Sequence, residues 1–156
     1  MSIHASDTQW ILETRSTAYT FELHATGMLL HNYWGPRLPQ PTDYPRERAG
    51  GKIVVGSYEL DAVPFNGLGN VLREEFPAYA GAKYIEPCLK ATFTDGVRDV
   101  VLTFDHAEVL DSDIPMLEIH LRDAHYPLSV ILTYCVWEEF DLIERYATVK
   151  NNRDTD

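Results

Sequence analysis

Apolar and polar residues alternate with a period of two along much of this chain. Three stretches, at residues 18–23, 99–104 and 117–122, place an apolar side chain at every second position. Successive side chains of a strand point to opposite faces, so each stretch is predicted to be a half-buried strand. Residues 128–137 are apolar on both faces, with Leu132 and Tyr134 on one and Ile131 and Cys135 on the other. This last stretch is therefore predicted to be a central strand.

Turn-forming residues separate these stretches. They occur at Thr26-Gly27, at Asp95-Gly96, and around residues 111–115, 123–127 and 138–141. The spacing is typical of successive antiparallel hairpins. Asp-Gly favours the positive φ angles of a tight hairpin turn, so we expect the segments on either side of Asp95-Gly96 to pair directly.

The alternation fails between residues 35 and 81, where prolines and glycines are frequent. Proline cannot donate a hydrogen bond to a ladder, so this region is predicted to be a long irregular loop with a short strand near residues 52–55. No stretch has the apolar spacing of an α-helix of ordinary length. The chain is therefore predicted to be all-β: an antiparallel β-sandwich that forms a single domain over residues 1–156.

The composition narrows the classes of partner. The 156 residues include 13 basic and 24 acidic side chains, which gives a net charge of −11. Binding to nucleic acid or to an anionic membrane surface relies on clusters of Lys and Arg, so both are disfavoured. A neutral partner such as a sugar stays open.

The small number of cysteines and the lack of a visible targeting signal indicate where in the cell the protein is expected. Cys88 and Cys135 are too few for a disulfide framework, and both are predicted to be reduced core thiols. No signal peptide and no apolar run of about 18 to 20 residues is visible. We therefore expect a cytoplasmic protein.

Two separated segments resemble a known family. Residues 31–35 read His-Asn-Tyr-Trp-Gly, and residues 75–79 read Glu-Phe-Pro-Ala-Tyr. In this order they resemble the amino-terminal β-supersandwich of glycoside hydrolase family 36, the α-galactosidases, and the similarity runs from about Trp10 to Asn151. The resemblance implies a galactose-mutarotase-like sandwich, here a partial one because the family domain is longer. It also implies a final strand from about Leu142 to Asn151.

The resemblance also implies candidates for the rim of a sugar pocket. Trp34, Tyr33 and Tyr84 flank the irregular region, and sugar C–H faces stack on such rings. The alternative is that these aromatic residues only pack the loop against the sandwich. Family members place an aspartate in the loop after the Trp-Gly pair, and Asp43 and Glu47 are the nearest candidates here. Ile85 stands where the family has an arginine, so a pair of polar contacts is lost there.

No catalytic residue is predicted in this chain. Retaining glycosidases need two carboxyl groups about 5 to 5.5 Å apart, and the family resembled supplies both from a downstream (β/α)8 barrel of at least about 200 residues. The acidic pairs at residues 74–75, 138–139 and 111 with 113 are interpreted as solvated carboxylates. The six histidines show no metal-ligand spacing along the chain, so neither a metal site nor a cofactor is expected.

Three functions stay open from the sequence. The first is a non-catalytic amino-terminal domain of an α-galactosidase-like enzyme that frames the sugar pocket and contributes to oligomer contacts. The second is a free-standing carbohydrate-binding sandwich, and the third is an interaction module that has lost sugar recognition. A partial sandwich leaves strand edges and an apolar face uncovered, so we also expect a homo-oligomer.

Overall fold

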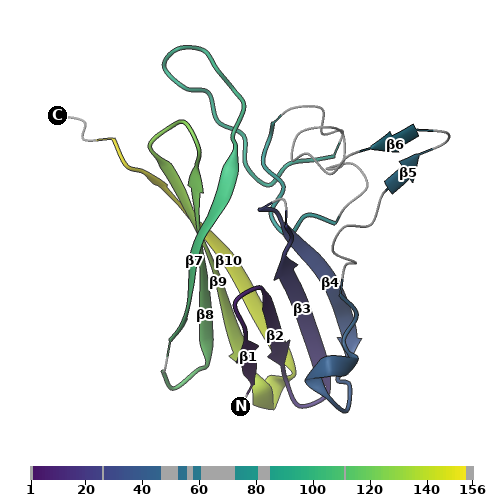
Figure 1. The fold of residues 1–156 in the computed structure, drawn as a ribbon. Helices are drawn as coiled ribbons and strands as arrows, with labels where there is room; N and C mark the ends of the chain where they lie inside the picture. Colours follow the sequence, from purple (N-terminus) through teal and green to yellow (C-terminus); the bar gives the residue numbers. More distant parts are fainter. Residues whose placement is uncertain are drawn as a thin grey trace.

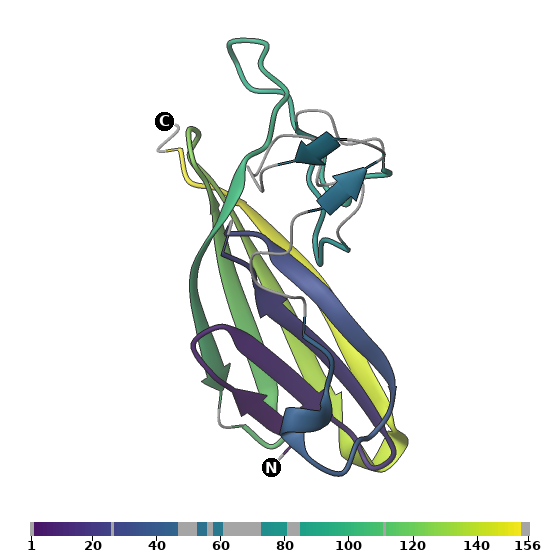
Figure 2. The same ribbon diagram turned by 45° about the vertical axis from the view of Figure 1, so that its right-hand side comes forward.

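Two antiparallel four-stranded sheets face each other in the computed structural model (Figure 1). The structure describes residues 2–25, 27–46, 73–80, 85–110 and 112–153, together with the backbone of residues 53–55 and 58–60. The predicted all-β sandwich is confirmed. In the turned view of Figure 2, the strands of the two sheets run nearly side by side, as in aligned sandwiches.

The first sheet is a meander of consecutive strands in the order β1-β2-β3-β4. Its strands are β1 (Ile3–Ala5), β2 (Gln9–Glu13), β3 (Thr17–Leu23) and β4 (Leu29–Pro36). The predicted strand at residues 18–23 corresponds to β3. β4 lies at the sheet edge and contains the His-Asn-Tyr-Trp-Gly segment.

The second sheet has the order β10-β9-β8-β7. Its strands are β7 (Leu102–Leu110), β8 (Met116–Asp123), β9 (Leu128–Trp137) and β10 (Leu142–Asn151). β9 pairs with β8 on one side and β10 on the other, which confirms the predicted central strand. β7 begins three residues later than predicted and extends to Leu110.

The core lies between the sheets and consists of the inward members of the alternating stretches. Trp10 stacks on Phe21 with ring centroids 5.4 Å apart, and Phe21 stacks on Tyr134 at 4.9 Å. Ile119 and Leu132 from the second sheet are fully buried in the same cluster. Each such buried side chain stabilises the fold by about 1.5 to 3 kcal/mol, so this core holds the two sheets together.

The connection between the sheets contains little regular structure in its described part. It includes a 3-10 helix η1 (Pro41–Asp43) and the paired short strands β5 (Ile53–Val55) and β6 (Tyr58–Leu60). The predicted short strand near residues 52–55 is thus confirmed as β5. A second 3-10 helix, η3 (Glu138–Phe140), precedes β10, and no α-helix occurs among the described residues.

The Asp95-Gly96 turn forms, but the expected hairpin does not. Gly96 has φ +85°, and the Phe93 N–H donates to the Val97 carbonyl at 2.8 Å. The flanking segments then continue without a ladder, and this loop projects beyond the end of the sandwich (Figure 1). The prediction of paired strands was wrong here. Most residues on either side of the turn are exposed, so no buried apolar face holds the two segments together.

The cysteine prediction is half correct. Cys135 is buried on β9, whereas Cys88 is exposed, and both are free. Cys88 lies in the irregular connection between the sheets, and apolar neighbours in the sequence are not enough to bury it there. Across the residues described, we find no helix with the length and hydropathy that crossing a bilayer would require.

Candidate functional site

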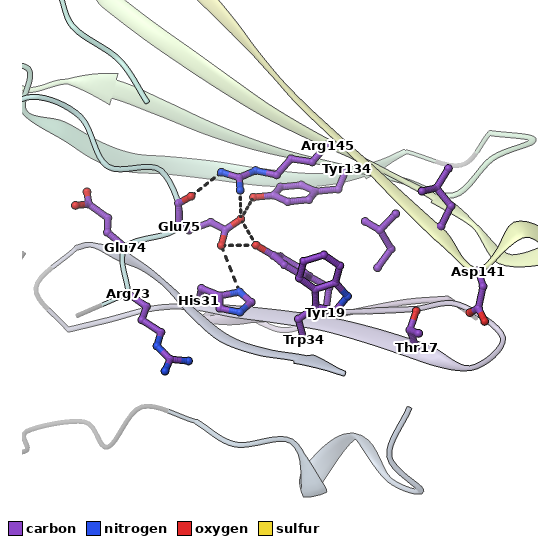
Figure 3. A pocket seen from close by; sticks show the side chains of 12 residues that line it. Thr17, Tyr19, His31, Trp34, Arg73, Glu74, Glu75, Tyr134, Asp141 and Arg145 are labelled. Carbon is purple, nitrogen blue, oxygen red and sulfur yellow. Dashed lines mark hydrogen bonds and ion pairs between the residues drawn. The ribbon is translucent and has the colours of Figure 1, made fainter. Parts of the chain in front are cut away.

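A pocket of about 560 Å³ opens between the two sheets, beside the edge strands β4 and β10. Figure 3 shows Glu75 directed toward side chains from both sheets, among them Tyr19, His31, Tyr134 and Arg145. The pocket lining includes Tyr19, His31, Trp34, Glu75, Tyr134 and Arg145.

Backbone pairing explains how Glu75 reaches the interior. The segment at residues 73–75 lies antiparallel to β4: His31 N–H donates to the Arg73 carbonyl at 2.7 Å, and Glu75 N–H donates to the Leu29 carbonyl at 2.8 Å. This added pairing directs the Glu75 side chain between the sheets. Tyr134 and Arg145 are directly opposite each other on β9 and β10, so both reach the same space.

The Glu75 carboxylate is the centre of a buried polar cluster and is only 4% exposed. The Tyr19 hydroxyl lies 2.8 Å from both carboxylate oxygens, and the Tyr134 hydroxyl donates to Oε1 at 2.8 Å. Arg145 Nη1 lies 3.3 Å from Oε1, and Arg145 Nη2 donates to the Glu75 carbonyl at 2.5 Å. The buried charge is therefore paired and hydrogen-bonded, as burial of an ionised group requires.

The charges in this cluster support one another. Burial, followed by the nearby Glu75 charge, raises the pKa of both Tyr19 and Tyr134 far above the ordinary tyrosine value. Burial is the largest single influence on the pKa of Arg145 and lowers it, but Glu75, Tyr134, Tyr19 and Cys88 together raise it by more, so the net shift is upward. At neutral pH the tyrosines therefore stay protonated donors, and the guanidinium stays charged.

His31 lies at the side of the cluster. Its ring centroid is 4.7 Å from that of Tyr19, and its Nδ1 lies 3.7 Å from Glu75 Oε2. Burial lowers the pKa of His31 below its ordinary value, although the Glu75 charge opposes the shift. His31 is therefore mainly neutral at pH 7.

The two ends of the pocket differ in chemistry. Trp34 is 75% exposed at the mouth and meets Tyr19 edge-on at 6.2 Å. Asp141, also in the lining, accepts hydrogen bonds from the hydroxyls of Thr14 and Ser16, which hold its carboxyl pKa well below the usual range. Two of the three carboxylates in the lining, those of Glu75 and Asp141, thus accept hydrogen bonds from protein donors, while the indole of Trp34 is exposed. An exposed ring beside polar groups suits a neutral polyhydroxylated ligand.

A second buried glutamate lies on the outer face of the first sheet. Glu13 accepts from the Tyr44 hydroxyl at 2.7 Å and forms ion pairs with Arg37 at 3.0 Å and His4 at 3.2 Å. Burial, together with the hydrogen bond to Glu13, raises the pKa of Tyr44 to about 12. Glu13 therefore fastens the segment at residues 37–46 against the sheet, away from the pocket.

The sequence model described as "Glycosyl hydrolase family 36 N-terminal domain" matches residues 27–156, which include the β4 motif, Glu75, Tyr134 and Arg145. The chain belongs to this family. The resemblance drawn from the two motifs is thus confirmed.

Similar proteins agree with this assignment. The bifunctional α-galactosidase/sucrose kinase AgaSK of Mediterraneibacter gnavus is 28% identical over 163 residues, which cover 90% of this chain and 16% of AgaSK. The crystal structure of α-galactosidase AgaB from Geobacillus stearothermophilus superposes with a TM-score of 0.76 at 22% identity, over 97% of this chain and 22% of AgaB. A variant of AgaA from the same organism, in complex with raffinose, gives a TM-score of 0.68 at 22% identity, over 92% of this chain and 22% of AgaA. The family 36 N-terminal domain described here thus spans less than a quarter of each of these relatives.

The structure separates the predicted rim residues. Trp34 lines the pocket, whereas Tyr33 packs on Tyr44 at 5.4 Å and donates its hydroxyl to the Pro36 carbonyl. Asp43 lies in η1, where it accepts from Gln40 N–H, and does not line the pocket. Glu47 and Tyr84 lie outside the described residues. Ile85, the departure from the family arginine, is exposed.

Sequence reasoning missed the buried cluster. The interpretation of Glu75 as a solvated carboxylate was wrong, because a strand-like pairing with β4 turns it inward. A signal was present: Tyr134 shares the inward alternation of Leu132 and Val136. A hydroxyl on an inward-facing side chain needs a buried hydrogen-bond partner. In this family 36 N-terminal domain the partner of the Tyr134 hydroxyl is the Glu75 carboxylate.

Proposed function

We propose that this chain is a non-catalytic domain of an α-galactosidase-like family 36 hydrolase, in which it frames one side of the sugar pocket. The match to the family over residues 27–156 supports the parent enzyme, and the relatives are named α-galactosidases. Retaining hydrolysis needs two carboxyl groups about 5 to 5.5 Å apart. Of the three carboxylates in the pocket lining, Glu75 and Asp141 are each held by protein donors, which fits a supporting role rather than turnover.

The exposed indole of Trp34 carries the pocket-framing part of this proposal. The Trp34 ring offers an apolar face and a polar N–H beside the pocket, a combination on which a sugar or a neighbouring domain can pack. The Tyr19 ring and the Glu75 cluster fix the floor beneath it. One of the structural relatives was crystallised with raffinose, an α-galactoside, and the proposed ligand belongs to that class.

Expression of the complete open reading frame that encodes this chain tests the proposal. We expect it to encode a (β/α)8 barrel and to hydrolyse both an aryl α-galactoside and raffinose. Trp34→Ala should raise the KM for raffinose by about 2- to 10-fold, the value of one aromatic contact, with little change in kcat. Phe140→Ala is the matched control, since Phe140 is 72% exposed but lies outside the pocket lining. Absence of a barrel, or equal KM values for the two variants, would contradict the proposal.

A free-standing carbohydrate-binding domain is the second candidate, favoured by the size of the pocket itself. Calorimetric titration of the 156-residue chain with galactose and with raffinose separates the two. A framing domain that needs the rest of the enzyme should give no heat, whereas a binding module should give heat that Trp34→Ala abolishes and Phe140→Ala does not.

The edge strand β10 supports a contact with another protein surface, either a second copy or the rest of the enzyme. Leu142, Tyr146 and Val149 are about half exposed on this strand, which pairs with no strand other than β9 in the described part of the chain. An apolar, unpaired edge favours association. We expect the isolated chain to form a homo-oligomer, and a monomer at high concentration in sedimentation velocity would contradict this.

A further inference from the structure

Four side chains that are apart in the sequence form a square on the outer face of β7 and β8. The register pairs His106 with His120 and Glu108 with Glu118. The alternate residues of β8, including Ile119, point into the core, so the four lie on the opposite face. A β-bulge between Phe104 and His106 sets this register. Its effect is to bring the two imidazoles into contact.

The distances in this square approach those around a metal ion. His106 Nε2 lies 3.4 Å from Glu108 Oε1, and His120 Nε2 lies 3.7 Å from the same oxygen. The three potential ligand atoms of His106, Glu108 and His120 all lie within 4.8 Å of one another. Tetrahedral zinc with bonds of about 2.0–2.1 Å places its ligand atoms about 3.3 Å apart. Two of the three separations, 3.4 and 3.7 Å, are thus already close to this value, and side-chain rotation would adjust the third.

Neighbouring groups already orient these ligands. His106 Nδ1 lies 3.0 Å from Asp105 Oδ2, which leaves Nε2 of His106 directed toward Glu108. The other Asp105 oxygen pairs with Arg122 Nε at 3.3 Å. A carboxylate on the far nitrogen of a histidine is the usual support of a metal ligand. The two imidazole rings are also held parallel, with centroids 4.1 Å apart and planes at 11°.

One nitrogen in the square lacks a hydrogen bond. His120 Nε2 is shielded from solvent and has no hydrogen-bond partner among the described residues, although Glu118 Oε2 lies 3.3 Å away. Three carboxylates, on residues 105, 108 and 118, face a single guanidinium, that of Arg122, so the fixed charge is −3 + 1 = −2 with neutral histidines. A shielded imidazole nitrogen without a hydrogen-bond partner, surrounded by net negative charge, is suited to bind a dication.

We propose that His106, Glu108 and His120 bind a transition-metal dication, zinc in the first instance, with Glu118 placed to supply a fourth ligand. Imidazole and carboxylate are ligands that zinc accepts. β7 is the edge strand of its sheet, so a metal bound here ties that edge to β8. This site is separate from the pocket, and its existence does not depend on the proposed function.

Calorimetric titration of the full 156-residue chain with zinc alone, at about pH 7.5 where free histidine is neutral, tests the site. We expect one zinc ion per chain with a Kd of micromolar order or tighter. His106→Ala, His120→Ala and Glu108→Gln should each weaken binding at least about tenfold, and Asp105→Asn should weaken it by a similar or smaller factor. His125→Ala is the control, since this exposed histidine lies outside the square.

A second measurement separates metal binding from loss of fold. Zinc should raise the melting temperature of the unmodified chain and of His125→Ala but not that of His120→Ala, while circular dichroism shows the same sheet content in all three. Millimolar or weaker zinc affinity in the unmodified chain would overturn the proposal. Equal affinity in the unmodified chain and in both histidine variants would overturn it as well.

Discussion

Glu75 and Glu13 are both buried glutamates that bind a tyrosine hydroxyl and an arginine, but they occupy different layers of the molecule. Glu13 lies under the loop on the outer face of the first sheet, and its tyrosine partner is 31 residues away. Glu75 lies between the sheets, and its partners on β9 and β10 are 59 and 70 residues away. The same chemistry therefore fastens a local loop in one place and joins both sheets in the other.

The position of each glutamate decides what depends on it. Loss of the Glu13 contacts releases one segment, whereas loss of the Glu75 contacts leaves an arginine and two tyrosine hydroxyls without their partner beside the pocket. Stability and the shape of the pocket are thus linked through Glu75. Glu13 does not line the pocket.

The largest effect is expected from Glu75→Gln. Removal of one charge from a buried ion pair costs about 3 to 5 kcal/mol, and we expect about 3 kcal/mol because Arg145 is partly exposed. Urea unfolding of the chain measures this loss. Glu86→Gln is the control: Glu86 pairs with Lys90 on the surface, where such pairs contribute about 0 to 1 kcal/mol. Similar losses of unfolding free energy in Glu75→Gln and Glu86→Gln would show that the buried contacts of Glu75 do not stabilise the fold.

A smaller and local effect is expected from Tyr44→Phe. The Tyr44 hydroxyl donates to Glu13 and accepts from Leu38 N–H, so its removal should cost about 1 to 3 kcal/mol. Hydrogen exchange should become faster at residues 37–46 and stay unchanged on β8 and β9. Tyr33→Phe, which loses only a hydrogen bond to the Pro36 carbonyl, should change little. Faster exchange throughout both sheets would show that the Glu13 contacts, like those of Glu75, stabilise the whole sandwich and not one segment.

The smallest effect concerns pH. Burial lowers the pKa of His31 in the folded chain, so below about pH 6.5 the unfolded chain takes up a proton that the folded chain does not. Stability therefore falls as the pH drops from about 6.5 through the lower folded pKa, and this contribution is fully present above pH 6.5. His31→Gln should show a shallower decline over this window in urea unfolding at stepped pH. An unchanged slope would mean that His31 is not shielded beside Glu75.

Strand alternation predicted most of the fold because it is a local property. β9 is central because both of its faces are apolar, and β3 and β8 lie where their alternating residues indicated. The failures have a common cause. Cys88 and the segments around Asp95-Gly96 look apolar or strand-like locally, yet Cys88 is exposed, and no strand among the described residues pairs with the segments beside that turn.

The candidate site was harder to predict than the fold. Trp34, which the motif predicts as a rim residue, lines the pocket, but Tyr33, one residue earlier, points to the other face as the pleat requires. Asp43 is held in its own 3-10 turn. Sequence proximity to the irregular region therefore did not indicate which side chains line the pocket.

By itself the sequence determined the strand faces and the family, because alternation and short motifs depend on residues close together in the chain. Only the tertiary structure decided that Glu75 is buried while Glu86 is not, and that His106 meets His120. Burial of a charge depends on partners that distant segments supply, and sheet register sets which side chains become neighbours. The spacing of residues along the chain indicates neither the burial of a charge nor the sheet register.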